Sequence, residues 1–163
     1  MPCQICTTCL SKAVQTEEAV HNYYLKMAEH FQNHPALESF LLSMAGDEAQ
    51  HAETLRQSLK SENHSEKIHN QSKKMIKQLE SIAKKLNRET QKKPSSFLDV
   101  YEFSDEMENE ELDAIFAFLV TETMDAHGTE LGYVLAALKT HVAKVSQLVS
   151  GGNVSNFKNF KPI

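Results

Sequence analysis

Apolar side chains recur along this chain at steps of three and four residues, the spacing of one helix face. The clearest stripe lies between residues 35 and 59 and consists of Leu37, Leu41, Met44 and Leu55. A second lies between residues 65 and 87 and consists of Ile68, Met75, Leu79, Ile82 and Leu86, with lysines on the other faces. No stretch of the sequence alternates apolar and polar residues as a strand does. The pattern therefore predicts an all-α protein.

Glycine and proline residues mark the ends of the predicted helices. We expect helices over residues 9–33, 35–59, 65–87, 97–126 and 128–150. Pro35 begins the second helix, and Pro94 ends the segment that contains the third helix. Ser95 or Ser96 can cap the helix that follows, and Gly151 stops the last one.

Glutamate or histidine interrupts four of these stripes near the middle of the helix. The interrupting residues are Glu18 and His21 in the first helix, Glu48 and His51 in the second, Glu108 and Glu111 after Pro94, and His141 in the last. A lone buried carboxylate costs several kcal/mol, and several of them together would repel one another. A divalent cation supplies the countercharge and binds both carboxylate oxygen and imidazole nitrogen. The interrupted stripes therefore predict a metal site inside the bundle.

The spacing of these residues indicates a duplicated helical hairpin. Glu18 and His51 are 33 residues apart, and so are Glu108 and His141. The offset of 90 residues between the two halves also aligns apolar positions with apolar positions. We therefore expect a helical hairpin in each half, with a long crossover helix between them. The predicted bundle spans residues 10–150, with hairpins 10–60 and 97–150 and the crossover helix at about 65–87.

The glutamate and histidine residues in the helix stripes, and their spacing, resemble those of the rubrerythrin branch of the ferritin-like di-iron proteins. The resemblance covers roughly residues 10–150. The resemblance implies a ferritin-like four-helix bundle with an additional long crossover helix and a site for two iron ions, with zinc or manganese as substitutes. The implied metal ligands are Glu18, Glu48, His51, Glu108, Glu111 and His141. Two features depart from the family: Leu138 stands where a fourth-helix glutamate is expected, and the rubredoxin domain of many relatives is missing.

The same resemblance implies a function. Rubrerythrins reduce hydrogen peroxide or dioxygen, which suggests an oxidoreductase of the peroxidase type. Electrons would come from a separate donor such as a rubredoxin-like protein, and a homodimer is expected because dimers are common in the family. Two alternatives stay open, namely metal binding or storage without catalysis, and DNA protection through the lysine-rich crossover helix. The catalytic residues themselves are not assigned.

Several residues have more than one interpretation at this point. Glu17 takes the role of Glu18 if the helix register shifts slightly. His21 is interpreted as a hydrogen-bonded core histidine in preference to a metal ligand. Tyrosines at positions 23, 24 and 101 either line the site or are half-buried. The three cysteines of the segment 1–9, at positions 3, 6 and 9, are either an electron-entry or zinc site or incidental thiols at a frayed terminus.

Composition and charge narrow the class of protein. The net charge is −5, yet residues 60–93 carry +6 and the rest of the chain −11. We interpret this basic segment as a solvated helix face, so nucleic-acid binding is the less favoured reading. Three cysteines argue against a secreted disulfide framework. Neither an apolar run of ~20 residues nor a signal-peptide pattern is present, so we expect a cytoplasmic protein without a membrane span. Residues 151–163 form the predicted tail.

Overall fold

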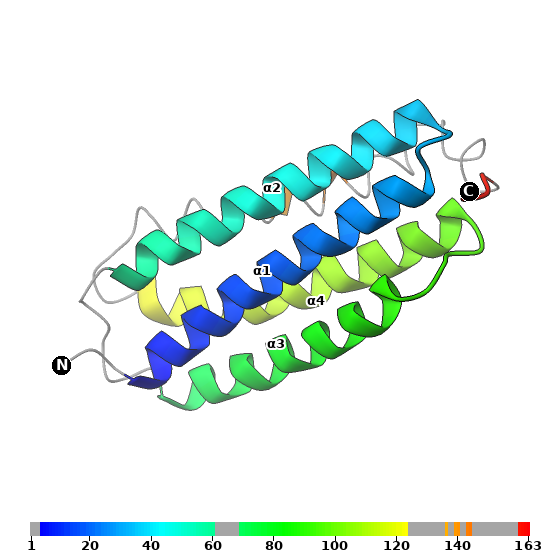
Figure 1. Ribbon diagram of the computed structural model, residues 1–163. Helices are drawn as coiled ribbons and strands as arrows, with labels where there is room; N and C mark the ends of the chain where they lie inside the picture. Colours follow the sequence, from blue (N-terminus) through cyan, green and yellow to red (C-terminus); the bar gives the residue numbers. More distant parts are fainter. Residues whose placement is uncertain (1–3, 61–68, 124–135, 137–138, 141–142, 145–159) are drawn as a thin grey trace.

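The computed structural model describes residues 4–60, 69–123, 136, 139–140, 143–144 and 160–163. The described residues form four long helices with near-parallel axes (Figure 1). These are α1 (Gln4–His30), α2 (Pro35–Lys60), α3 (His69–Thr90) and α4 (Phe97–Thr123). Helix α1 lies between α2 and α3, and α4 packs on α3. The expected all-α, ferritin-like helical bundle is confirmed, with α3 in the place of the crossover helix. The predicted last helix, 128–150, lies mostly outside the described residues.

The start of α1 differs from the expectation. The helix begins at Gln4 and not at residue 9, so Cys9 is a helical residue that is fully buried. Between Gln4 and Cys9 there is no glycine or proline to interrupt helical hydrogen bonding, and the Thr8 hydroxyl donates a hydrogen bond to the Gln4 carbonyl (2.9 Å). The N-terminal cysteine segment therefore continues the first bundle helix.

Two of the predicted stripes form the core as expected. All four α2 residues of the first stripe are buried, and so are the four described residues of the α3 stripe: Leu37, Leu41, Met44, Leu55, Met75, Leu79, Ile82 and Leu86. The lysines of α3 at positions 73, 74, 77 and 84 are exposed, which agrees with a solvated basic face. None of the four described helices is both long and apolar enough to span a lipid bilayer.

The core face of α1 is shifted by one residue from the predicted stripe. A run of buried positions follows strict three-four steps through Leu10, Ala13, Glu17, Val20, Tyr24, Met27 and Phe31. The predicted stripe continued the same stepping through Val14, Glu18, His21, Leu25 and Ala28; Val14 and Ala28 are buried, but the three residues between them are not. The large side chains of Tyr24, Met27 and Phe31 decide the register, because burying them removes more apolar surface from water than burying Leu25 would.

The connections at one end of the bundle are held by specific contacts. Asp99 accepts hydrogen bonds from the backbone amides of Ser95 and Ser96 (2.8 and 3.0 Å), as the N3 residue of a capping box does. The backbone N–H of Phe97 donates to the carbonyl of Phe160 (3.0 Å), whose ring stacks on His34 between α1 and α2. The last described residues therefore join the α1–α2 turn to the start of α4.

Replacing Leu79 with alanine should lower the free energy of unfolding by about 3 kcal/mol, because a buried leucine of α3 leaves a cavity when truncated. The matched control is Lys77→Ala on the exposed face of the same helix, which should change it by less than about 0.5 kcal/mol. Urea denaturation measures both values. Equal losses would show that α3 does not pack on the bundle through this stripe.

Candidate metal centre

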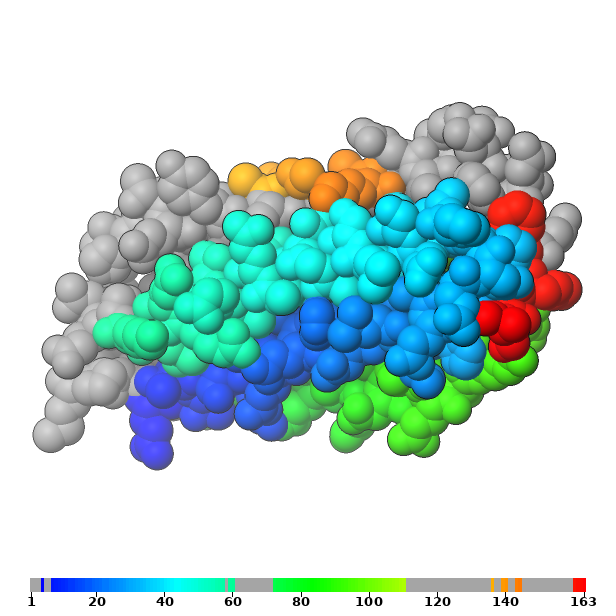
Figure 2. Space-filling view, turned by 45° about the horizontal axis from the view of Figure 1, so that its top comes forward, coloured from blue at the N-terminus to red at the C-terminus, as the bar shows by residue number. Residues whose placement is uncertain are grey.

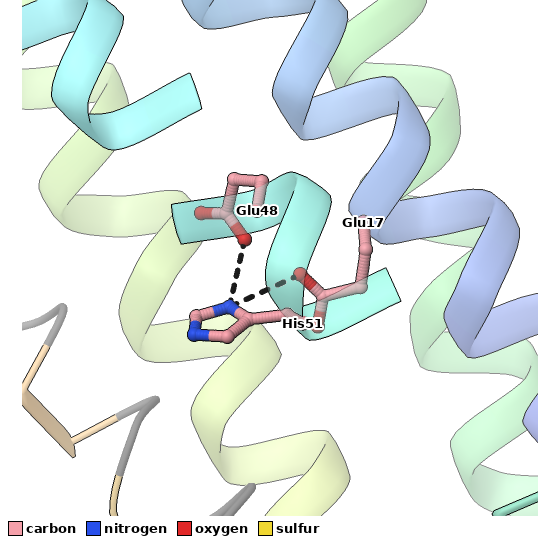
Figure 3. Close-up of side chains that lie close together, drawn as sticks. All are labelled: Glu17, Glu48 and His51. Carbon is pink, nitrogen blue, oxygen red and sulfur yellow. Dashed lines mark hydrogen bonds and ion pairs between the residues drawn. The ribbon is translucent and has the colours of Figure 1, made fainter. Parts of the chain in front are cut away.

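A carboxylate–histidine cluster lies in the core between α1 and α2. Glu17 comes from α1, and Glu48 and His51 come from α2 at the i, i+3 spacing that places two side chains on one helix face. One potential ligand atom from each residue lies within 4.8 Å of the others. Figure 3 shows both carboxyl groups pointing toward the same imidazole ring. The three side chains are therefore arranged as they would be around one metal ion.

The polar contacts of the cluster converge on one nitrogen. Nδ1 of His51 is 3.0 Å from Oε2 of Glu48 and 3.5 Å from Oε2 of Glu17. Glu17 and Glu48 are fully buried, and His51 is 6% exposed. Neither oxygen of Glu17 accepts a hydrogen bond from a described group. A buried carboxylate that lacks hydrogen bonds is costly, and a cation at this position would remove that cost.

In the metal-free protein, burial and the neighbouring charges shift the pKa values of the cluster residues. Burial raises the pKa of Glu17 well above its usual value, and the neighbouring charge of Glu48 raises it further. Burial alone would lower the pKa of His51, but the carboxylates of Glu17 and Glu48 face its Nδ1 and favour the protonated ring, which raises the pKa to about 10. Without a metal, the imidazolium of His51 therefore serves as the countercharge. A divalent cation would replace the protons held by these residues.

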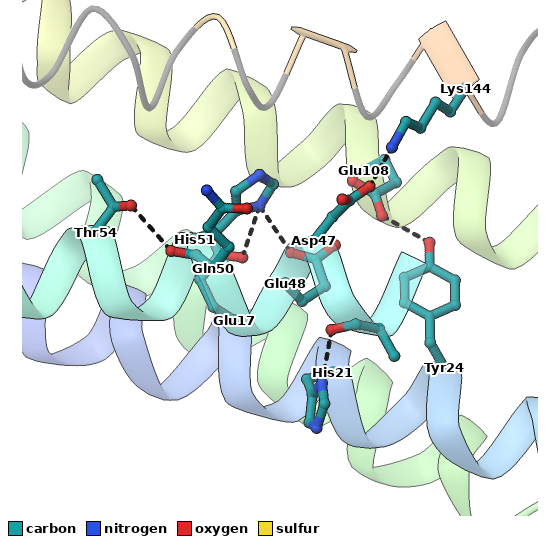
Figure 4. A network of polar contacts seen from close by, with 11 residues as sticks. Glu17, His21, Tyr24, Asp47, Glu48, Gln50, His51, Thr54, Glu108 and Lys144 are labelled. Carbon is teal, nitrogen blue, oxygen red and sulfur yellow. Dashed lines mark hydrogen bonds and ion pairs between the residues drawn. The ribbon is translucent and has the colours of Figure 1, made fainter. Parts of the chain in front are cut away.

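A third buried acid among the described residues lies on α4. Glu108 is 2% exposed, and its Oε1 accepts a hydrogen bond of 2.6 Å from the hydroxyl of Tyr24 (Figure 4). Burial raises the pKa of the Tyr24 hydroxyl, and the charges of Glu108 and Glu48 raise it further. Tyr24 therefore lies near both carboxylates and keeps its proton, which it shares with Glu108.

The structure places the six predicted ligands as follows. Glu48, His51 and Glu108 are buried in the bundle. Glu18 is half exposed and forms an ion pair with Arg56, so the α1 carboxylate in the cluster is that of Glu17. Glu111 belongs to α4, but its side chain lies outside the described residues, as does the whole of His141.

Two contacts near the cluster concern His21 and the predicted last helix. Nδ1 of the half-buried His21 lies 2.7 Å from the backbone carbonyl of Ala45, so His21 contacts α2 and is not part of the cluster. Lys144 forms an ion pair of 2.5 Å with Asp47, the residue before Glu48. This contact brings a described part of the predicted last helix to α2 beside the candidate site.

Replacing Tyr24 with phenylalanine should lower the free energy of unfolding of the metal-free protein by about 2 kcal/mol. The variant keeps the ring but loses a hydrogen bond to a buried carboxyl group. Tyr101→Phe, which changes a half-buried tyrosine on α4, should have an effect below about 0.5 kcal/mol. Urea denaturation in the presence of a chelator compares the two, and indistinguishable variants would argue against the Tyr24–Glu108 contact.

The fold and the site together define a class of protein, namely a helical bundle with a candidate carboxylate–histidine metal centre in its core. The family model described as Rubrerythrin matches residues 8–123. The chain therefore belongs to the rubrerythrin family, whose members are di-iron proteins. No curated protein and no solved structure matches the chain.

Proposed function

We propose that this protein is a rubrerythrin-type oxidoreductase that binds two iron ions and reduces hydrogen peroxide or dioxygen, with electrons from a separate donor protein. The observation that carries the proposal is the burial of Glu17, Glu48 and His51 with their ligand atoms facing one another. Family membership supports iron as the metal. When bound, the iron pair would supply the two electrons that reduce the oxidant.

Side chains of the buried cluster would hold the metal, and a neighbouring tyrosine would hold a proton close to it. Glu17, Glu48 and His51 would form one side of the site, and Glu108 the side that belongs to α4. Reduction of one peroxide molecule to two waters consumes two electrons and two protons. The Tyr24 hydroxyl holds a proton at Glu108, within the same buried region, and would keep that carboxylate oriented. The apolar core around the cluster would limit the access of water.

The test is a stoichiometric reaction under anaerobic conditions. Protein loaded with ferrous iron should hold close to two ions per chain. It should consume one peroxide molecule for every two ferrous ions oxidised, faster than free ferrous iron at the same concentration. The Glu48→Ala/His51→Ala variant is the control, and it should neither hold the iron nor accelerate the reaction. Wild-type protein that holds no iron after this loading would contradict the proposal.

Metal binding without turnover is the second candidate, and one feature of the sequence favours it. Leu138 replaces the fourth-helix glutamate that the family pattern leads us to expect, and it lies outside the described residues. A site that is short of one carboxylate would hold its second ion weakly. Wild-type protein that binds iron but does not consume peroxide would support this candidate over the oxidoreductase.

A further inference from the structure

An open pocket lies where the connection between α3 and α4 passes α1. Its volume is about 200 Å³, which leaves room for several water molecules. Exposed residues, among them Lys92, Lys93 and Asp99, line its outer part, and the buried residues Tyr23 and Met27 of α1 line its inner part. Water in the pocket therefore reaches a tyrosine that is itself only 2% exposed.

Hydrogen bonds hold the outer part of the pocket in place. Nζ of Lys161 donates a hydrogen bond to the carbonyl of Ser95 (3.2 Å), and Asp99 accepts one from the backbone amide of Ser95 (2.8 Å). Figure 2 shows residues 160–163 (red) beside the green surface at this end of the bundle. The pocket therefore lies on a part of the surface whose backbone is fixed by specific contacts.

Tyr23 is held between aromatic neighbours. Its ring packs edge-on against that of Tyr24, with 5.5 Å between the centroids, and lies tilted against that of Phe103, with 5.0 Å between the centroids. Tyr23 lines the pocket, whereas the hydroxyl of Tyr24 donates the hydrogen bond of 2.6 Å to Glu108. The two adjacent tyrosines of α1 therefore extend from the pocket to the candidate metal centre.

Ser104 places a third hydroxyl beside these two tyrosines. It is 4% exposed and precedes Glu108 on α4 by four residues, so both side chains lie on one face of that helix. Burial raises the pKa of the hydroxyls of Tyr23 and Tyr24, whereas hydrogen bonding with Ser104 lowers the pKa of both. A serine hydroxyl donates one hydrogen bond and has two lone pairs that accept, so Ser104 can link one tyrosine to the other.

We infer that Tyr23, Ser104 and Tyr24 form a relay that carries protons from water in the pocket to Glu108. Glu108 takes the hydroxyl proton of Tyr24, Tyr24 takes that of Ser104, and Ser104 takes that of Tyr23. Tyr23 then takes a proton from water in the pocket. The net transfer is one proton from solvent to the Glu108 carboxylate, and each hydroxyl group ends as it began.

The role of the relay rests on the proposed function, which consumes two protons for each peroxide molecule reduced. Glu17, Glu48 and Glu108 are at most 2% exposed, so protons from solvent need a path to them through polar groups. Phenylalanine and alanine would fill the positions of Tyr23 and Ser104 without burying a polar group, which costs free energy unless it is hydrogen-bonded. The two hydroxyls that packing does not require are those that complete the path.

Exchange of the Tyr24 hydroxyl proton with water tests the relay in the metal-free full chain. NMR detects this proton, its loss in Tyr24→Phe assigns it, and saturation transfer from water measures its exchange rate. Tyr23→Phe and Ser104→Ala should each slow the exchange at least ~10-fold, because the proton then leaves only when the region opens locally. The matched control is Tyr101→Phe, which removes a half-buried hydroxyl of α4 outside the relay and should leave the rate within ~2-fold of the wild type.

The same variants distinguish the relay from the proposed function. Loaded with ferrous iron, Tyr23→Phe and Ser104→Ala should hold as much iron as the wild type and oxidise it with peroxide at least ~10-fold more slowly. Slower hydroxyl exchange in a protein that consumes no peroxide would support the relay and reject the oxidoreductase. Exchange at the wild-type rate in both variants would overturn the relay, whatever the rate with peroxide. Slower exchange with an unchanged peroxide rate would overturn its role in the reaction.

Discussion

Glu17→Gln is expected to weaken divalent metal binding at least ~100-fold, whereas Glu18→Gln next to it should change the affinity by less than ~3-fold. The amide keeps the shape of the side chain but removes a buried negative charge whose ligand atom lies within 4.8 Å of those of Glu48 and His51. Glu18 is half exposed and paired with Arg56 outside the core. Competition with a chromophoric chelator measures both affinities on otherwise matched proteins.

Comparing the two variants distinguishes metal binding at the Glu17 cluster from nonspecific attraction of a cation to negative charge on α1. Both substitutions remove one negative charge from adjacent positions of α1, so long-range electrostatics change almost equally. If Glu18→Gln weakened binding as much as Glu17→Gln, or more, the assignment of Glu17 as the α1 ligand would be wrong. Circular dichroism of each variant controls for folding.

The second expected result is an opposite pH dependence of stability in the metal-free and metal-loaded protein. In the metal-free form, the His51 pKa is raised from 6.5 to about 10. Its contribution to folding is therefore complete below pH 6.5 and is lost as pH rises toward 10. The pKa of Glu17 is also raised, so the native state retains a proton that the unfolded chain releases, and the sign is the same.

With metal bound, the sign reverses. The ligands must be deprotonated to bind a cation, so the native state then holds fewer protons than the unfolded chain does at acidic pH. At a fixed metal concentration, stability should rise between about pH 5 and pH 7. Urea denaturation with a chelator and with excess metal gives both curves. A metal-free wild type whose stability rises with pH over the range 6.5–10 would contradict the predicted role of His51, and His51→Gln should flatten that curve.

Sequence pattern predicts α2 and α3 well because their apolar residues are unambiguous. Each stripe consists of large aliphatic or methionine side chains at helix spacing, and all of its described members are buried. Glu48 and His51 follow from the α2 stripe by the same stepping, and both are buried. In these helices the buried face follows the stripe, so the periodicity predicts which residues enter the core.

Helix α1 shows where the pattern fails. Two candidate stripes, offset by one residue, both contain apolar residues, and the predicted one includes Leu25, which is exposed. The spacing of 33 residues between Glu18 and His51 favoured that stripe because it matches Glu108 and His141. The strict steps from Leu10 to Phe31 are a signal that would have indicated Glu17. Tertiary packing of Tyr24, Met27 and Phe31 chooses between the two registers, and helix period alone does not specify it.

We expect one cation to bind between Glu17, Glu48 and His51. Anomalous X-ray diffraction from crystals of the metal-loaded protein, collected on both sides of the absorption edge of the metal, would locate this cation. An anomalous peak should lie within about 2.0–2.3 Å of Nδ1 of His51 and of a carboxylate oxygen of each glutamate. A peak elsewhere, or crystals of loaded protein in which the three side chains surround no anomalous density, would contradict it.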